Sequence, residues 1–89
     1  MTDDPPTDVV TVLGQLLAAT RTALAEGDQT TARETITSAE TVATNKLPAG
    51  DRRAVLVHGC ERILDLLKED ERDVAAAYIS AMERRLPEE

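Results

Sequence analysis

Large aromatic side chains are almost absent from this sequence, which has no Trp, no Phe and one Tyr, Tyr78. A core built without them must be aliphatic and rich in Ala, a composition that suits helices packed closely together. The same shortage leaves few large anchor residues for a binding site. The sequence therefore predicts a small domain of closely packed helices.

Cysteine and histidine each occur once, which limits the possible chemistry. Cys60 has no second Cys with which to form an internal disulfide, and on an apolar face it is expected to act as a small hydrophobic residue. His58 falls near Glu61 and Asp65, but a stable metal site needs three or four ligands at suitable spacing. His58 and Cys60 lie about 200° apart around a helix, so they do not form a base–nucleophile pair. We expect no catalytic residue, no metal ligand and no cofactor.

Long apolar runs are also absent. No uninterrupted stretch reaches the roughly 18 residues of a membrane span. The first residues, MTDDPPTD, are acidic and contain no apolar run, unlike a signal peptide. We expect a cytoplasmic protein without membrane contacts, with a disordered tail over residues 1–6 and a single helical domain over residues 7–87.

Lysine is scarce and acidic residues are abundant. Lys occurs only at Lys46 and Lys68, Arg supplies the other eight basic residues, and the 17 Asp and Glu residues give a formal charge of −7. Such a charge argues against direct binding to nucleic acid or to an anionic membrane. The composition resembles that of proteins from salt-loving archaea, which implies that the acidity keeps the surface solvated in molar salt. An acidic protein from a GC-rich mesophile is the alternative.

The spacing of apolar residues predicts four helices, over 8–26, 29–46, 52–68 and 71–86. Gly27 can end the first helix and Asp28 can begin the second, which predicts a tight turn between antiparallel helices. The sequence Leu-Pro-Ala-Gly at 47–50 ends the second helix. The expected fold is all-α, a four-helix bundle of two antiparallel hairpins, 7–47 and 51–87.

The segment 68–73 leaves a second topology open. It contains six charged residues without Gly or Pro, and helical phase is kept across it by Leu67, Val74, Tyr78 and Ala81. The last two helices could therefore form one rod of about 35 residues, which would force dimerisation. In the bundle, Asp70 would instead be the N-cap of the fourth helix, whose buried face would be Val74, Tyr78, Ala81 and Met82, flanked by Ala75, Ile79 and Leu86.

A faint internal repeat favours a turn at 68–73. A shift of 42 residues pairs Asp28, Ala32, Ile36 and Ala39 with Asp70, Val74, Tyr78 and Ala81. Within each hairpin this pattern resembles a tetratricopeptide repeat. The resemblance implies helical hairpins, in a bundle or a short stack, that can hold a partner peptide.

The stretch 54–67 is the most apolar in the chain, and its apolar arc covers about 200° of a helix. Val55 and Leu66 share one edge of that arc. They are either an exposed apolar strip that binds a partner or core residues of a bundle. Arg52 and Arg53 lie in the first turn, where cations oppose the helix dipole, so a partner carboxylate or phosphate is a possible reason for them.

These patterns favour binding over catalysis. The leading interpretation is a non-enzymatic protein-interaction or adaptor module that pairs with itself as a homodimer or with another protein. A small accessory transcriptional regulator acting through a DNA-binding partner is the alternative. A metal- or ligand-binding enzyme comes third, because no polar groups converge.

Overall fold

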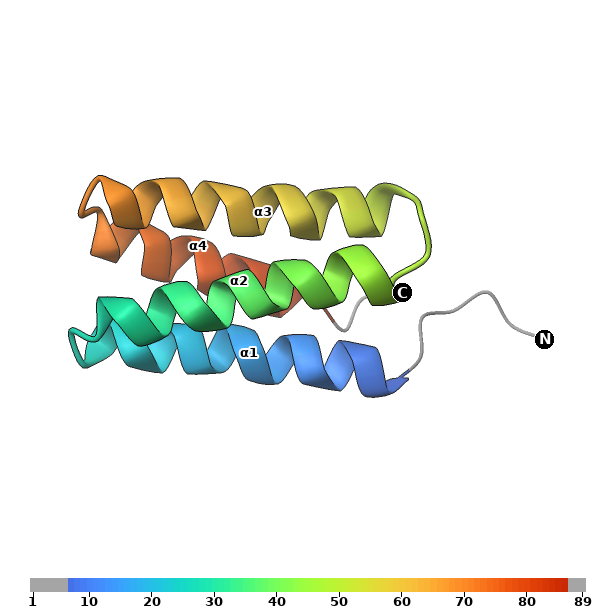
Figure 1. Ribbon diagram of the computed structural model, residues 1–89, viewed down its shortest axis with the longest axis horizontal. Coiled ribbons are helices and arrows are strands. Elements are labelled where there is room, and N and C mark those ends of the chain that lie inside the picture. The colour runs from blue at the N-terminus through green and yellow to red at the C-terminus, as the bar shows by residue number, and fades with distance from the viewer. Residues whose placement is uncertain (1–6, 87–89) are drawn as a thin grey trace.

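The computed structural model describes residues 7–86, which form four helices and no strand. The helices are α1 (Thr7–Ala25), α2 (Gln29–Lys46), α3 (Asp51–Lys68) and α4 (Arg72–Arg85). The predicted hairpins are confirmed, and the alternative of one long rod is wrong because the chain reverses between α3 and α4 (Figure 1). The tail predicted over 1–6 lies outside the described residues.

The helices close into an up-down-up-down bundle. Each helix has two neighbours, and among the described residues no Cα atom of α1 lies within 8 Å of one in α3, nor one of α2 within 8 Å of one in α4. In Figure 1, α1 and α3 lie on opposite sides, with α2 in front of α4. Both hairpin turns lie at one end of the bundle and the α2–α3 connection lies at the other. None of the described helices combines the length and the hydropathy of a membrane span.

The turn between α1 and α2 forms as predicted. Gly27 adopts a left-handed conformation with φ of 78°, and its N–H donates to the carbonyl of Leu24. The N–H of Asp28 donates to the carbonyl of Ala23, which completes a Schellman motif. The Asp28 carboxylate then caps α2 by accepting from the N–H and the hydroxyl of Thr31. These hydrogen bonds lower the pKa of Asp28.

The turn between α3 and α4 uses the same motif without glycine. Asp70 occupies the left-handed position with φ of 61°, and its N–H donates to the carbonyl of Leu67. The N–H of Glu71 donates to the carbonyl of Leu66. The prediction that Asp70 is the N-cap of α4 is wrong, because Asp70 ends α3 and Glu71 is the N-cap residue. Asp tolerates this conformation because its short polar side chain can form local hydrogen bonds.

Because Gly27 and Asp70 are equivalent, the internal repeat has a period of 43 residues and not 42. The same shift relates the buried residues of the hairpins. In the first pair of helices, Leu13, Leu17, Thr20, Ala23 and Leu24 of α1 match Leu56, Cys60, Ile63, Leu66 and Leu67 of α3. In the second pair, Ala32, Ile36, Ala39 and Ala43 of α2 match Ala75, Ile79 and Met82 of α4 and Leu86 after it.

The corrected repeat changes the buried face of α4. Three of the residues predicted to be core, Val74, Tyr78 and Ala81, lie on the outside: Val74 is 48% exposed, Ala81 is exposed and Tyr78 is half-buried. Met82 is buried as predicted, and the residues expected only to flank that face, Ala75, Ile79 and Leu86, are the core. The error has one cause, since pairing Asp70 with Asp28 moved every later residue by one position.

Candidate interaction surface on α3 and α4

Val74, Tyr78 and Ala81 form a line of apolar residues on the outer side of α4, here called the α4 stripe. Residues spaced by four and then three positions lie on one side of a helix. Beside the stripe, Val55 of α3 is 51% exposed. A groove of about 140 Å³ lies between the two helices, lined by Val55, Leu56, Tyr78, Ala81, Met82 and Arg85. The bundle therefore leaves an apolar surface unpartnered on this side.

Gly59 allows α3 and α4 to pack closely under this groove. A Cβ atom at Gly59 would lie 2.8 Å from both Sδ and Cε of Met82 and 3.5 Å from Cε1 of Tyr78. The space that a side chain at position 59 would take is thus filled by Met82 and by the edge of the Tyr78 ring. This contact fixes one edge of the ring and leaves the rest of Tyr78 available at the surface.

The first hairpin shows that the fold does not require apolar residues in the α4 stripe. With the 43-residue shift, the equivalents of Val74, Tyr78 and Ala81 are Thr31, Thr35 and Ser38. The helix that carries these polar residues packs as well as α4 does, with its core residues Ala32 and Ile36 fully buried. The apolar character of Val74 and Ala81 is therefore an additional feature of the second hairpin, whereas Tyr78 also fills space beside Gly59, where the first hairpin has Leu16.

The four residues predicted at the interface do not all lie on this surface. Val55 is exposed, whereas Leu66 is only 3% exposed and packs in the core. The interpretation that places Leu66 on an exposed strip is wrong, because the arc of α3 that includes Leu66 faces α4. Arg53 lies on the α2 side of α3, where Nη1 donates to the carbonyl of Thr44 at 3.4 Å. Arg52 is half-buried at the start of α3.

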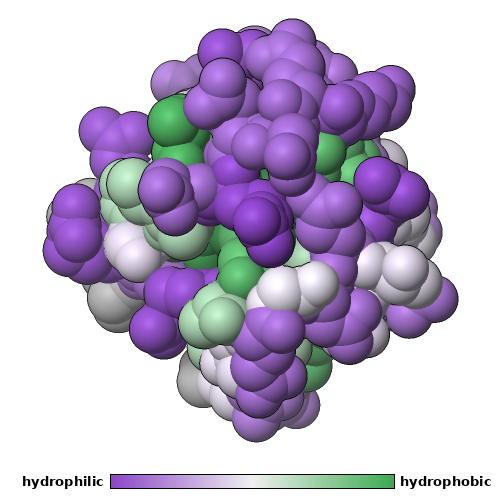
Figure 2. Space-filling view, turned by 90° about the vertical axis from the view of Figure 1, so that its left-hand side faces the viewer, coloured by the Kyte–Doolittle hydropathy of each residue, from purple (hydrophilic) through white to green (hydrophobic). Residues whose placement is uncertain are grey.

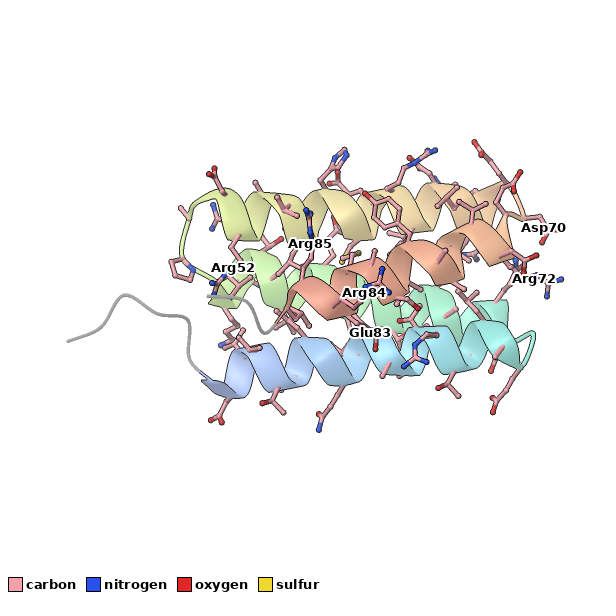
Figure 3. All side chains as sticks on the ribbon, turned by 180° about the vertical axis from the view of Figure 1, so that it is seen from behind. Arg52, Asp70, Arg72, Glu83, Arg84 and Arg85 are labelled. Carbon is pink, nitrogen blue, oxygen red and sulfur yellow. The ribbon has the colours of Figure 1, made fainter. Side chains whose placement is uncertain are left out.

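Charges of opposite sign lie at the two ends of this face. Arg52 and Arg85 lie at the end away from the α3–α4 turn (Figure 3). Glu69 and Glu71 are exposed at the turn itself. Figure 2 looks onto the end of the bundle that carries the α3–α4 turn, where the surface is mainly hydrophilic. Arg85 lines the groove. Sequence reasoning did not single it out, because a cation in the last turn of a helix is already favoured by the helix dipole.

The opposite side of α4 is tied to α1. Arg21 Nε donates to Glu83 Oε1 at 2.9 Å, and Nη2 of the same residue donates to Glu83 Oε2 at 3.3 Å. This bidentate pair holds α4 against the first helix. The α4 stripe lies on the other side of the helix from this ion pair.

The groove between α2 and α3 has a different character. Its lining includes Arg53, His58 and Glu61. The pKa of Glu40 is raised, mainly because its carboxyl group is partly buried. The negative charge of Glu61 and a hydrogen bond with Glu61 raise it further. Burial, assisted by the two carboxylates, raises the pKa of the Cys60 thiol to about 12. A thiol that stays protonated is a poor nucleophile and a poor metal ligand. The residues that the structure describes contain no group of three or more possible metal ligands.

Comparison with protein families shows a match over nearly the whole chain. Residues 1–88 match a domain of unknown function, DUF8101. The chain belongs to this family. No curated protein and no solved structure matches the DUF8101 chain.

Replacing Glu40 with Gln in this DUF8101 chain is expected to stabilise it at neutral pH. Because the pKa of Glu40 is raised in the folded state, that state binds a proton more tightly than the unfolded state does. At pH values above the folded-state pKa, the ionised Glu40 carboxylate therefore destabilises the folded state. This destabilisation is relieved as the pH falls through that pKa. Glu40→Gln should raise Tm at pH 7, and the difference should shrink towards pH 4.5. Thermal unfolding monitored by circular dichroism checks this.

The exposed Glu34 on the same helix offers a matched control, since Glu34→Gln also removes one negative charge. Equal effects of the two substitutions at pH 7 and at pH 4.5 would contradict a specific role for the Glu40–Glu61 pair.

Proposed function

We propose that this DUF8101 chain is a non-enzymatic protein-interaction module that binds the apolar side of a partner helix along the α4 stripe. The observation that carries the proposal is the line formed by the exposed Val74 and Ala81 and the half-buried Tyr78. The equivalent helix of the same fold has Thr31, Thr35 and Ser38 there. Exposed apolar residues are unfavourable for solubility unless a partner covers them. Helices bind one another through apolar residues at this spacing.

The size of the groove supports a helical partner. At about 140 Å³, it is smaller than the roughly 300–1,000 Å³ of sites for drug-sized ligands. It suits a single aliphatic side chain projecting from a partner helix. Tyr78 would supply the largest contact, with an apolar ring and a polar hydroxyl at its edge.

The setting of this interaction is part of the proposal. The single, buried Cys60 suits a reducing cytoplasm, and the acidic, Lys-poor composition suits a high-salt milieu. In molar salt, charges more than about 3 Å apart are largely screened from one another. Apolar contacts persist under the same conditions. Binding measurements therefore belong in both molar KCl and dilute salt.

A triple variant, Val74→Thr, Tyr78→Thr and Ala81→Ser, tests the proposal. It gives α4 the residues that the equivalent helix already carries. Because Tyr78 also fills space beside Gly59, where the first hairpin has Leu16, helix content and Tm of the variant are measured with its binding, and binding is compared only while the variant is folded. The probes are two synthetic amphipathic helices of about 20 residues, one with an acidic and one with a basic polar face. We expect the wild type to bind at least one peptide and the triple variant to bind it at least tenfold more weakly, by fluorescence anisotropy.

Val12→Thr is the matched control, because Val12 is equivalent to Val55 and is 40% exposed on the first hairpin. This control should bind the peptides as the wild type does. Equal binding by the wild type and the triple variant would overturn the proposal, as would a wild type that binds neither peptide.

A further inference from the structure

We infer that the occupant of the α4 stripe is a second copy of the same chain, packed antiparallel with α4 against α4. This inference rests on the proposed function, because it assigns a partner to the same surface. It is carried by the order of residues along the outer side of α4. Glu71, Val74, Tyr78, Ala81 and Arg85 follow one another at alternating spacings of three and four residues. That spacing is typical of the seam between two packed helices.

The seam is self-complementary in one orientation only. Glu71 and Arg85 lie seven residues before and seven residues after Tyr78. When two copies run antiparallel about a twofold axis at Tyr78, Glu71 of each copy faces Arg85 of the other. Val74, four residues before Tyr78, then lies beside Ala81 of the other copy, three residues after Tyr78, with an offset of one residue along the helix. The two Tyr78 side chains meet near the axis. A parallel arrangement would place Glu71 against Glu71 and Arg85 against Arg85, which is unfavourable.

The contacts of the described side chains are compatible with this arrangement. Glu71 and Arg85 are both exposed, and Glu71 makes no side-chain hydrogen bond that caps α4. Val74 is 48% exposed, so it can contact another chain without any change in the bundle. A twofold contact also closes on itself and does not extend into a filament.

The interface is small. The 14 residues of α4 give a contact about 21 Å long, with Val55 and the groove at its edge. Contacts of this size are weak or transient. The fraction of dimer should therefore change with protein concentration.

Sedimentation equilibrium of the full chain tests the inference over about a hundredfold range of concentration. We expect the average mass of the wild type to rise from 9.6 kDa towards twice that value. The triple variant should stay at the monomer mass, and Val12→Thr should behave as the wild type does. A triple variant that pairs as well as the wild type would overturn the assignment of this surface.

A wild type that stays monomeric at every concentration also overturns the inference, and the peptide experiment then separates two cases. If peptides bind the wild type and not the triple variant, the proposed function stands and the occupant is a different protein. If no peptide binds, the proposed function fails as well.

Cysteine cross-linking tests the antiparallel register and does not depend on the triple variant. A mixture of Val74→Cys and Ala81→Cys chains should form a mixed disulfide dimer under mild oxidation. Each variant alone should cross-link at least tenfold less. Efficient cross-linking of either variant with itself would overturn the antiparallel arrangement. Cys60 is 1% exposed, and the wild type is the control for its reactivity.

Discussion

Leu66→Glu is expected to unfold the protein. Leu66 is 3% exposed and packs where α3 faces α4. The substitution removes a buried aliphatic side chain and places a carboxylate in the apolar core, which together cost at least about 4 kcal/mol. Small domains have free energies of unfolding near the lower end of about 5–15 kcal/mol. We expect loss of most helical signal at 25 °C, or a fall in Tm of about 20 °C or more, measured by circular dichroism.

Val55→Glu is the matched variant on the same helix. Because Val55 is 51% exposed, its replacement should change the free energy of unfolding by about 0.5 kcal/mol or less. A folded Leu66→Glu variant with near-native Tm would contradict the position of α3 in the bundle. So would a Val55→Glu variant that unfolds.

Ile79→Ala is expected to have the second largest effect. Ile79 is fully buried in a core that contains many Ala residues, so neighbouring side chains cannot move far enough to fill the space. Replacing a buried Ile with Ala costs about 2–5 kcal/mol. We expect a loss of about 3 kcal/mol and a fall in Tm of about 15 °C, measured by urea and thermal unfolding.

Val74→Ala is the comparison that tests the register of α4. Val74 lies on the outer side of the helix, and its truncation should change the free energy of unfolding of the monomer by about 0.5 kcal/mol or less. The reverse order, a large loss for Val74→Ala and a small one for Ile79→Ala, would show that α4 buries the other face. The α4 stripe would then be core, and no binding surface would remain.

The helices and their connections could be predicted from local sequence features. Gly27 and Asp28 determine the first turn, and Pro48 with Gly50 determines the α2–α3 connection. The small and large apolar residues of the repeat in the first hairpin, Ala32, Ile36 and Ala39, are buried. These features act over a few residues, so they can be recognised without knowledge of the packing.

The register of α4 could not be predicted because the second turn lacks glycine. Asp is common both as a helix N-cap and, less often, in the left-handed conformation. The sequence alone favours the N-cap role for Asp70, whereas the chain uses it with φ of 61° to end α3. Because α4 is apolar on two sides, with Val74 and Ala75 adjacent, neither hydrophobicity nor periodicity corrects that error.

The candidate site was missed for the same reason. An apolar residue at helical spacing is usually assigned to the core, so Tyr78 and Ala81 were expected to be buried. Comparison of the two hairpins at the 43-residue spacing could have found the site, since it pairs Tyr78 with Thr35 and Ala81 with Ser38. That comparison requires the correct turn, which only the packing reveals.

The most direct test of the binding surface is amide NMR of the wild type, recorded from dilute to concentrated protein and with the amphipathic peptides. The account predicts that chemical-shift changes concentrate on residues 71–85 and near Val55. The equivalent positions in the first hairpin, around Val12 and Thr35, should change little. Changes centred on the first hairpin, or no change under any condition, would contradict the assignment of the α4 stripe as the surface through which this protein binds.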